Sequence, residues 1–205
     1  MTFMIYECSK SHIDEVSKLL NEGGIIVYPT DTVYGIGCYP YYTKSINRIY
    51  EIKGRDYHKP LSILGSSIKD IENLVYLNEI GFKLAKEFWP GGLTIVAPLR
   101  DQKIPSIVHS GKNTLAVRIP NYECTLNLLN KCKYIIGTSA NRSGEEVSSD
   151  YKKIIASIKG FNAIIKDIES KNRKESTIVE INTDKVTILR EGAIPSKKIF
   201  DVIEQ

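Results

Sequence analysis

The sequence predicts an α/β (α+β) protein, with a mixed parallel and antiparallel sheet and helices packed against it. Short apolar segments of strand length alternate along the chain with segments whose apolar residues recur at helical spacing. Of its 205 residues 42% are hydrophobic and 25% are charged, a composition typical of a globular protein with a core of ordinary size. Neither a repeat nor a low-complexity linker divides the chain, so we expect one domain over residues 1–205.

Eight apolar segments are expected to form strands, because aliphatic residues dominate them and turn-forming or charged residues flank them. They are residues 25–28, 61–64, 93–98, 115–119, 134–137, 162–166, 177–181 and 185–190. The segments after residue 162 follow one another closely, which indicates an antiparallel portion of the sheet.

Helices are expected between these strands. Ser9 or Ser11 can cap a first helix that ends at Gly23-Gly24, and Thr43 can cap a second. The core-facing residues of these two helices would be Ile13, Val16, Leu19, Leu20, Ile46, Ile49, Tyr50 and Ile52. Further helices are expected near residues 67–74, 79–88, 122–131, 150–158 and 196–203.

Charge and cysteine content limit the class of protein. Cys8, Cys38, Cys124 and Cys132 form no CxxC pair and have no histidine at zinc-ligand spacing, so we expect reduced cysteines and no bound structural metal. No apolar segment is long enough to span a membrane and no secretory leader is visible, so we expect a cytoplasmic protein without a membrane partner. The net charge of +4 is compatible with an anionic ligand or RNA and requires neither.

The segment YPTDTVYGIG is the first candidate ligand site, because it follows an expected strand and precedes an expected helix. It is neither a GxGxxG fingerprint nor a P-loop. Thr30, Asp31 and Thr32 could bind a small polar ligand, or their side chains could bond their own backbone in an ordinary loop.

Basic and small polar residues gather in other segments. In KGRDYHKP, Lys53, Arg55 and Lys59 could clamp phosphates or form a solvated helix end. Arg118 interrupts an apolar strand and must therefore reach water or an anion, which a structural carboxylate or a ligand could supply. The segments GTSANRSG, with Ser139 and Asn141, and ESTIVE followed by ILREGAI, with Ser176 and Arg190, are compatible with polar loops or with ligand contacts.

Two further features bear on function. The segment FWPGGLT is assigned to structure, with a core tryptophan and a helix stop at the proline. The three histidines do not accompany a serine or cysteine nucleophile motif. An enzyme built from these segments would therefore work by positioning its substrates and by neutralising charge.

Seven segments occur in the order of one known family: PTDTVYG, KGR with KPL, WPGGLT, LAVRIP, TSANRSG, ESTIVE and ILREGAI. Between about residues 12 and 195 the chain resembles the YrdC/TsaC family of L-threonylcarbamoyladenylate synthases, in the single-domain form. The resemblance implies a twisted mixed sheet with a basic, concave cleft. It also implies an enzyme that makes threonylcarbamoyl-AMP and pyrophosphate from L-threonine, bicarbonate and ATP. A partner transferase complex then uses this adenylate to modify tRNA beside the anticodon.

The resemblance also implies roles for individual residues. The L-threonine site would comprise Thr32, Arg118, Gly137 and Ser176. ATP would be bound by Lys53, Arg55, Lys59, Thr114, Ser139, Asn141 and Arg190. Lys53, Arg55 and Arg118 would be the catalytic residues, with Mg²⁺ accompanying the ATP and no metal ligand assigned to the protein.

Leu64 departs from the pattern, because longer family members have a threonine-binding histidine at that position. One alternative is a non-catalytic module that binds double-stranded or ribosomal RNA through the basic cleft. A net charge of +4 is small for that role, since each phosphate contact needs a cation, although a weak tRNA contact is compatible with it. A second alternative is the carbamoyl-handling domain of hydrogenase-maturation proteins, which normally lies within a much longer chain.

Overall fold

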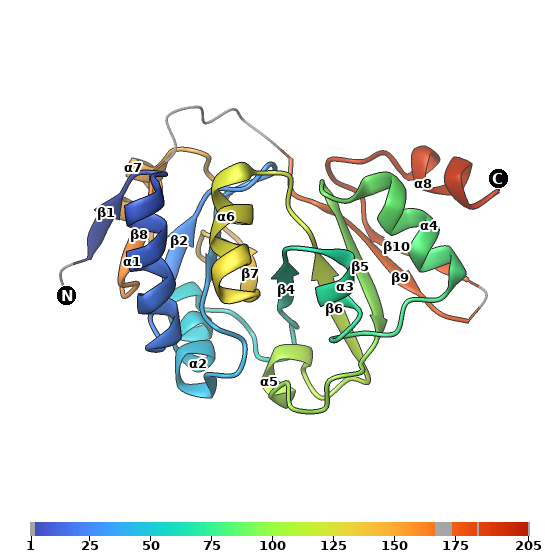
Figure 1. The fold of residues 1–205 in the computed structure, drawn as a ribbon, viewed down its shortest axis with the longest axis horizontal. Helices are drawn as coiled ribbons and strands as arrows, with labels where there is room; N and C mark the ends of the chain where they lie inside the picture. The colour runs from blue at the N-terminus through green and yellow to red at the C-terminus, as the bar shows by residue number, and fades with distance from the viewer. Residues whose placement is uncertain (1–2, 167–173, 184, 205) are drawn as a thin grey trace.

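The computed structural model describes residues 3–166, 174–183 and 185–204. Its strands are β1 (Met4–Tyr6), β2 (Ile26–Tyr28), β3 (Gly35–Gly37), β4 (Ser62–Gly65), β5 (Leu93–Pro98), β6 (Thr114–Arg118), β7 (Tyr134–Ser139), β8 (Ala163–Ile165), β9 (Thr177–Ile181) and β10 (Val186–Arg190). Its helices are α1 (Lys10–Asn21), α2 (Thr43–Lys53), α3 (Ile68–Ile71), α4 (Glu79–Phe88), α5 (Ser106–His109), α6 (Glu123–Cys132), α7 (Tyr151–Ser157) and α8 (Ser196–Ile203). Strand β1 lies at one end of the molecule and α8 at the other (Figure 1).

The strands of the described chain form one sheet in the order β1-β8-β2-β3-β7-β4-β6-β5-β9-β10. Strand β8 pairs in parallel with both β1 and β2, and the pairs β4–β6 and β5–β9 are also parallel. The other pairs are antiparallel, including β9 with β10 near the C-terminus. The expected α/β class and the expected antiparallel portion are both confirmed.

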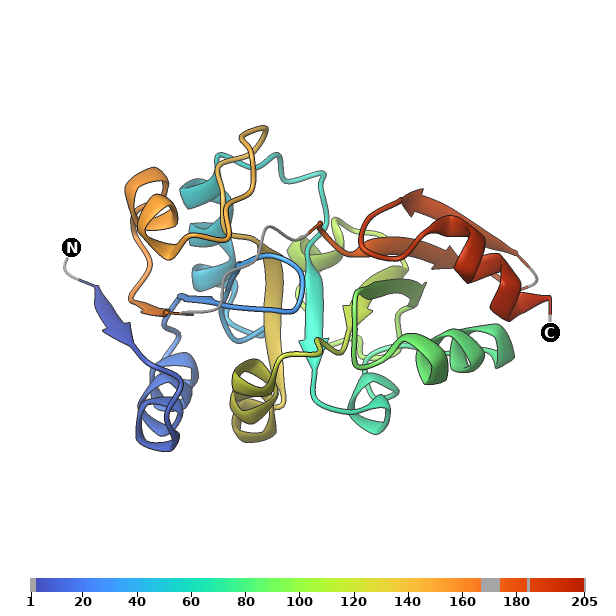
Figure 2. The ribbon, with the colours of Figure 1, turned by 90° about the horizontal axis from the view of Figure 1, so that it is seen from above.

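Several strands of the sheet are buried on both faces, as their unbroken hydrophobic sequences indicate. In β7, Ile135 packs in the cluster beneath α1 and α6, whereas Ile136 packs in the large cluster on the opposite face. Strand β2 divides in the same way, with Ile26 on the first side and Val27 on the second. Figure 2 shows α1 and α6 on one side of the sheet, and α2 and α7 on the other.

Two short strands and one short helix were not expected from the sequence. Strand β3 reads Gly-Ile-Gly and lacks a β-branched run, yet it pairs with both β2 and β7. Glycine is required there, because a Cβ on Gly37 would collide with the carbonyl oxygen of Ile136. Strand β1 and helix α5 are too short, at three and four residues, to give a periodic signal.

The helix caps are partly as expected. Ser9 caps α1, and its side chain accepts a hydrogen bond from the backbone N–H of His12 at 3.3 Å. Thr43 was expected to cap α2, and this is wrong: Tyr42 occupies the cap position and makes no side-chain cap bond. The Tyr42 hydroxyl instead donates to the carbonyl of Asn21 at 2.6 Å, so this segment is anchored to the end of α1.

The expectation of four reduced cysteines is also wrong. Cys8 and Cys124 form a disulfide with a Cα–Cα distance of 5.7 Å, although 116 positions separate them. Helices α1 and α6 pack side by side, which brings the segment before α1 against the first turn of α6. Cys38 and Cys132 are free and buried. Among the described residues, none of the helices is long and apolar enough to cross a membrane.

Candidate active site

A cavity of about 780 Å³ is lined by residues of several strands of the sheet and of the loops beside them. It has the size of an ordinary small-molecule site. The loop between β2 and β3 contributes to its wall, as do the segment after α2 and the ends of β7, β9 and β10. Eight of the eleven residues expected from the sequence line it: Thr32, Arg55, Lys59, Arg118, Gly137, Ser139, Ser176 and Arg190. Lys53, Thr114 and Asn141 do not line it.

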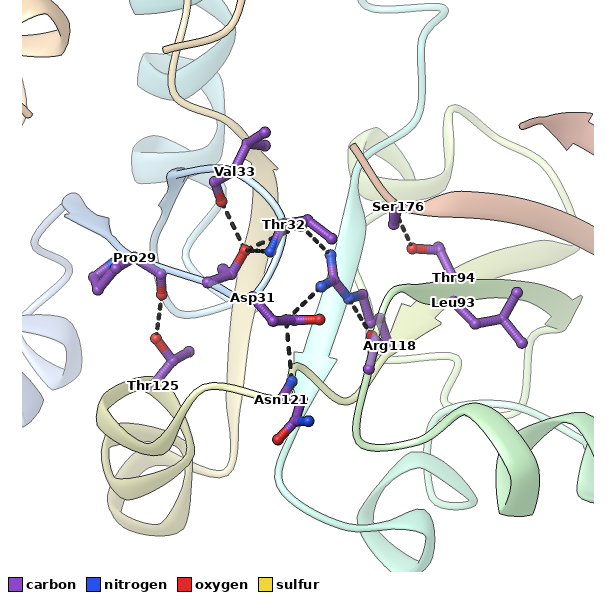
Figure 3. A network of polar contacts seen from close by, with 12 residues as sticks. Pro29, Asp31, Thr32, Val33, Leu93, Thr94, Arg118, Asn121, Thr125 and Ser176 are labelled. Atoms are coloured by element: carbon purple, nitrogen blue, oxygen red, sulfur yellow. Dashed lines mark hydrogen bonds and ion pairs between the residues drawn. The ribbon is translucent and has the colours of Figure 1, made fainter. Parts of the chain in front are cut away.

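Arg118 lines the cavity and is almost fully buried, and Figure 3 shows its polar contacts. Its Nη2 donates to Asp31 Oδ1 at 2.6 Å, its Nη1 to Thr32 Oγ1 at 2.8 Å, and its Nε to the carbonyl of Gly91 at 2.8 Å. Asp31 is therefore the structural carboxylate that the sequence left open, and it offsets the cost of burying the guanidinium. A guanidinium has five N–H donors, so two remain for a ligand.

The two threonines of the β2–β3 loop form a chain of hydroxyls. Thr30 Oγ1 donates to the carbonyl of Val33 at 2.7 Å, so the bond of 3.0 Å between the two hydroxyls takes its proton from Thr32. Thr32 also accepts from Arg118, and its oxygen keeps one further lone pair at the cavity wall. The loop thus combines both readings of the sequence: its side chains bond one another, and they also present a hydroxyl to the cavity.

A second hydroxyl pair lies on the other side of Arg118 from this loop, where Thr94 Oγ1 and Ser176 Oγ are 2.9 Å apart (Figure 3). Arg190 donates from Nε and Nη2 to the carbonyl of Ser176 at 3.1 and 2.9 Å, and its Nη1 pairs with Glu175 at 2.9 Å. Ser176 is therefore held from two sides, by the start of β5 and by the end of β10.

Thr94 belongs to FWPGGLT, and the assignment of that segment to structure alone is incomplete. Trp89 is indeed a buried core residue whose Nε1 donates to the carbonyl of Leu93 at 2.7 Å. The same segment nevertheless places Thr94 in the cavity wall, and its Gly91 carbonyl accepts a hydrogen bond from Arg118. The sequence does contain a hint of this role for Thr94, because it is a polar residue inside an otherwise apolar strand.

Besides Arg118, three cations line the cavity: Arg55, Lys59 and Arg190. Gly54 ends α2 in the left-handed conformation, with φ of 57°, and turns the chain so that Arg55 follows outside the helix. The Arg55 side chain donates from Nε to the carbonyl of Lys59 at 3.1 Å and from Nη2 to that of Pro60 at 2.9 Å. Among the described residues that line the cavity, Glu175 is the only carboxylate, so the cavity favours an anion.

Part of the cavity wall is apolar and closely packed. Tyr28 is fully buried, and its hydroxyl donates to the carbonyl of Ile136 at 2.9 Å. A Cβ on Gly137 would lie 3.0 Å from Leu64, so glycine keeps the backbone close to the packed leucine. Leu64 therefore presents an aliphatic side chain at the position where longer family members have a histidine. Neither Tyr28 nor Leu64 was among the site residues expected from the sequence.

Lys53, Asn141 and Thr114 lie outside this lining. Lys53 is 2% exposed, and its ammonium donates to the carbonyls of Ser139 and Asn141 and to Asn141 Oδ1. Burial lowers the pKa of Lys53 to about 7. Thr114 begins β6 beside Pro98, at the end of the strand away from Arg118. The expected ATP contacts of these three residues stay predictions.

The fold and the cavity define an α/β protein with a cleft lined by cations, by hydroxyl groups and by a buried arginine. Residues 18–192 match the family model Sua5_yciO_yrdC, whose description is "Telomere recombination". The chain belongs to this family, which confirms the expectation from the seven ordered motifs.

Relatives match nearly the whole of this chain. A protein of Pyrococcus abyssi named threonylcarbamoyl-AMP synthase is 34% identical over 187 residues, which are 90% of this chain and 55% of that protein. A protein of Methanocaldococcus jannaschii, named putative threonylcarbamoyl-AMP synthase, is 34% identical over 200 residues, 95% of this chain and 94% of its own length. The crystal structure of P. abyssi Sua5 complexed with L-threonine superposes with a TM-score of 0.92 at 31% identity, covering 99% of this chain and 61% of that one. The chain thus spans little more than half of the P. abyssi relative.

Proposed function

We propose that the protein is a threonylcarbamoyl-AMP synthase, which forms L-threonylcarbamoyladenylate and pyrophosphate from L-threonine, bicarbonate or CO2, and ATP. The observation that carries the proposal is one continuous cavity, lined by Arg118, by two pairs of hydroxyls and by three further cations. Such a cavity suits an amino acid joined to a nucleoside triphosphate. The name of the P. abyssi relative and its complex with L-threonine support the same activity.

The substrates are assigned to the lining residues by charge and by hydrogen-bonding capacity. The two remaining donors of Arg118 bind the threonine carboxylate, and Thr32 and Ser176 offer hydroxyls to its polar atoms beside Gly137. Arg55, Lys59, Arg190 and Ser139 bind the phosphates of ATP. The carboxylate and the phosphates then contact different cations of one cavity.

The chemistry needs positioning and charge neutralisation more than a protein base. The threonine amine adds to CO2 and loses a proton to solvent, which gives a carbamate, and a carbamate oxygen then attacks the α-phosphorus of ATP. The bond from this phosphorus to the bridging oxygen breaks, and pyrophosphate leaves with the electron pair. Arg55, Lys59 and Arg190 stabilise the charge that develops on the phosphate oxygens.

Mg²⁺ is part of this proposal, and it would neutralise phosphate charge during the displacement. The described residues contain no group of three side chains able to hold a metal ion, and Glu175 is the one carboxylate among those that line the cavity. This donor set fits a metal ion held mainly by the phosphates of the substrate, as is usual for Mg²⁺.

We extend the proposal to the use of the product. The adenylate would pass to a tRNA threonylcarbamoyl transferase complex, which forms N6-threonylcarbamoyladenosine beside the anticodon, and this role places the protein in the cytoplasm. We also treat residues 1–205 as a single domain, because one continuous sheet runs through the described chain.

The test is to incubate purified protein with ATP, bicarbonate and labelled threonine, and to look for labelled adenylate and pyrophosphate. We expect both products, and neither when bicarbonate is omitted. With valine, pyrophosphate should be released far more slowly than with threonine, and with serine at an intermediate rate. A site that bonds a substrate hydroxyl has unpaired polar groups when the analogue lacks that hydroxyl. Absence of the adenylate, together with tight binding of duplex RNA, would support the RNA-binding alternative instead.

A further inference from the structure

Lys53, the last residue of α2, has an ammonium group whose three protons all face protein oxygens. One proton points to the carbonyl of Ser139, a second to the carbonyl of Asn141 at 2.8 Å, and a third to Asn141 Oδ1 at 3.2 Å. An ammonium has three donors and no acceptor, so none is left for a phosphate. The residue is 2% exposed and does not line the cavity.

The same bonds tie the end of α2 to the segment that follows β7. The backbone N–H of Ser143 donates to the Lys53 carbonyl at 2.7 Å, so Lys53 contacts this segment through its backbone as well as its side chain. Within the segment, Ser139 Oγ donates to Asn141 Oδ1 at 2.6 Å, and Asn141 Nδ2 donates to the carbonyl of Glu145 at 2.7 Å. Of these residues only Ser139 lines the cavity.

We propose that Lys53 is a positioning residue, which holds Ser139 and the segment 139–145 in place and does not itself bind the phosphates of the ligand. This inference rests on the proposed function for the identity of that ligand. Carbonyl and amide oxygens that converge on one point repel one another, and the buried ammonium compensates this repulsion. The cations that touch the phosphates are then Arg55, Lys59 and Arg190.

Hydrogen exchange in the absence of ligand tests the positioning role directly. In Lys53→Met, the amides of residues 139–145 should exchange about tenfold faster or more, because the segment loses its anchor. Lys59→Met is the matched control, because Lys59 is exposed and, within the described chain, its side chain makes no bond to this segment. Unchanged exchange in Lys53→Met would overturn the proposal.

A double-mutant cycle on ATP affinity separates an indirect effect from a direct contact. If Lys53 acts through Ser139, the variant Lys53→Met/Ser139→Ala should bind ATP as weakly as Lys53→Met alone, within about twofold. The pair Lys59→Met and Ser139→Ala should instead show additive losses. Additive losses for Lys53 and Ser139 would overturn the proposal.

A measurement on the wild-type protein covers the case in which Lys53→Met fails to fold. With ¹⁵N-labelled lysine at about pH 6, below the lowered pKa of Lys53, titration with inorganic triphosphate should shift the Nζ signal of Lys59 and leave that of Lys53 in place. A Lys53 shift as large as that of Lys59 would overturn the proposal. If neither signal moves, the proposed phosphate clamp fails, and the exchange experiment, which needs no ligand, still decides the role of Lys53.

Discussion

The buried guanidinium of Arg118 pairs with the partly buried carboxylate of Asp31, with 2.6 Å between Nη2 and Oδ1. Asp31 also accepts the backbone N–H of Asn121 at 3.0 Å, as Figure 3 shows. The pair joins the loop after β2 to the end of β6, 87 positions further along the chain. It therefore shapes the cavity and also contributes to the stability of the fold.

Asp31→Ala should lower the free energy of unfolding by about 3–5 kcal/mol, because it leaves the buried Arg118 without its counter-charge. Urea denaturation measures the change. The control is Glu51→Ala, which breaks the exposed pair with Arg48 and should cost less than about 1 kcal/mol. Equal losses in the two variants would show that the Asp31 pair is energetically no different from a surface pair.

Thr94→Val should reduce kcat/KM for adenylate formation by about tenfold, because Ser176 loses the hydroxyl 2.9 Å away that orients it. Thr94→Ser keeps that hydroxyl and should restore most of the activity. Steady-state kinetics on both variants, with thermal unfolding as the check on folding, measure the effect. A serine variant as impaired as the valine variant would contradict an orienting role for the hydroxyl.

Arg55→Ala should weaken ATP binding by about tenfold to a hundredfold, since a charge-assisted contact contributes roughly 1.5–3 kcal/mol. Arg55→Lys should recover only part of the ATP affinity. A lysine cannot bond the carbonyls of Lys59 and Pro60 and also offer two parallel N–H donors to a phosphate, as a guanidinium can. Calorimetric titration measures both affinities. Arg48→Ala, on the preceding helix but paired with Glu51, is the control and should bind ATP normally.

Cys8→Ser should lower the free energy of unfolding by about 2–4 kcal/mol, because the disulfide to Cys124 closes a long loop of the unfolded chain. A reducing agent should lower the stability of the wild type by a similar amount and leave that of the variant unchanged. Denaturant unfolding with and without reductant makes the comparison. A wild type indifferent to reductant would show that the disulfide contributes nothing.

The pKa of Lys53 should make stability depend on pH. Burial lowers this pKa from 10.5 to about 7, with a further lowering by Arg55 and an opposing effect of Glu175. Between these two values the unfolded chain holds a proton that the folded protein lacks, so the free energy of unfolding rises with pH, by at most about 1.4 kcal/mol per pH unit. The stability of the wild type relative to Lys53→Met should therefore rise above about pH 7 and stay level below it. A difference that stays level up to about pH 10 would contradict the lowered pKa.

Hydrophobic periodicity was enough to predict most of the elements of the fold. The apolar run before Tyr28 predicted β2, and the helical spacing of residues 79–88 predicted α4 with the bounds that the structure has. Strand β3 was missed, because its glycines are set by the approach of Ile136 from a distant strand. Local sequence contains the hydrophobic periodicity and the capping residues of an element. It does not show which distant strands will pair with a very short strand and stabilise it.

The sequence by itself determined the order of the elements, the family, and eight of the eleven expected residues in the cavity wall. Only the tertiary structure decided the partners: Asp31 for Arg118, Thr94 for Ser176 and Cys124 for Cys8. It also turned Lys53 inward, toward the carbonyls after β7. These partners lie 82 to 116 positions apart, so they depend on strand order and helix packing, which no local pattern encodes.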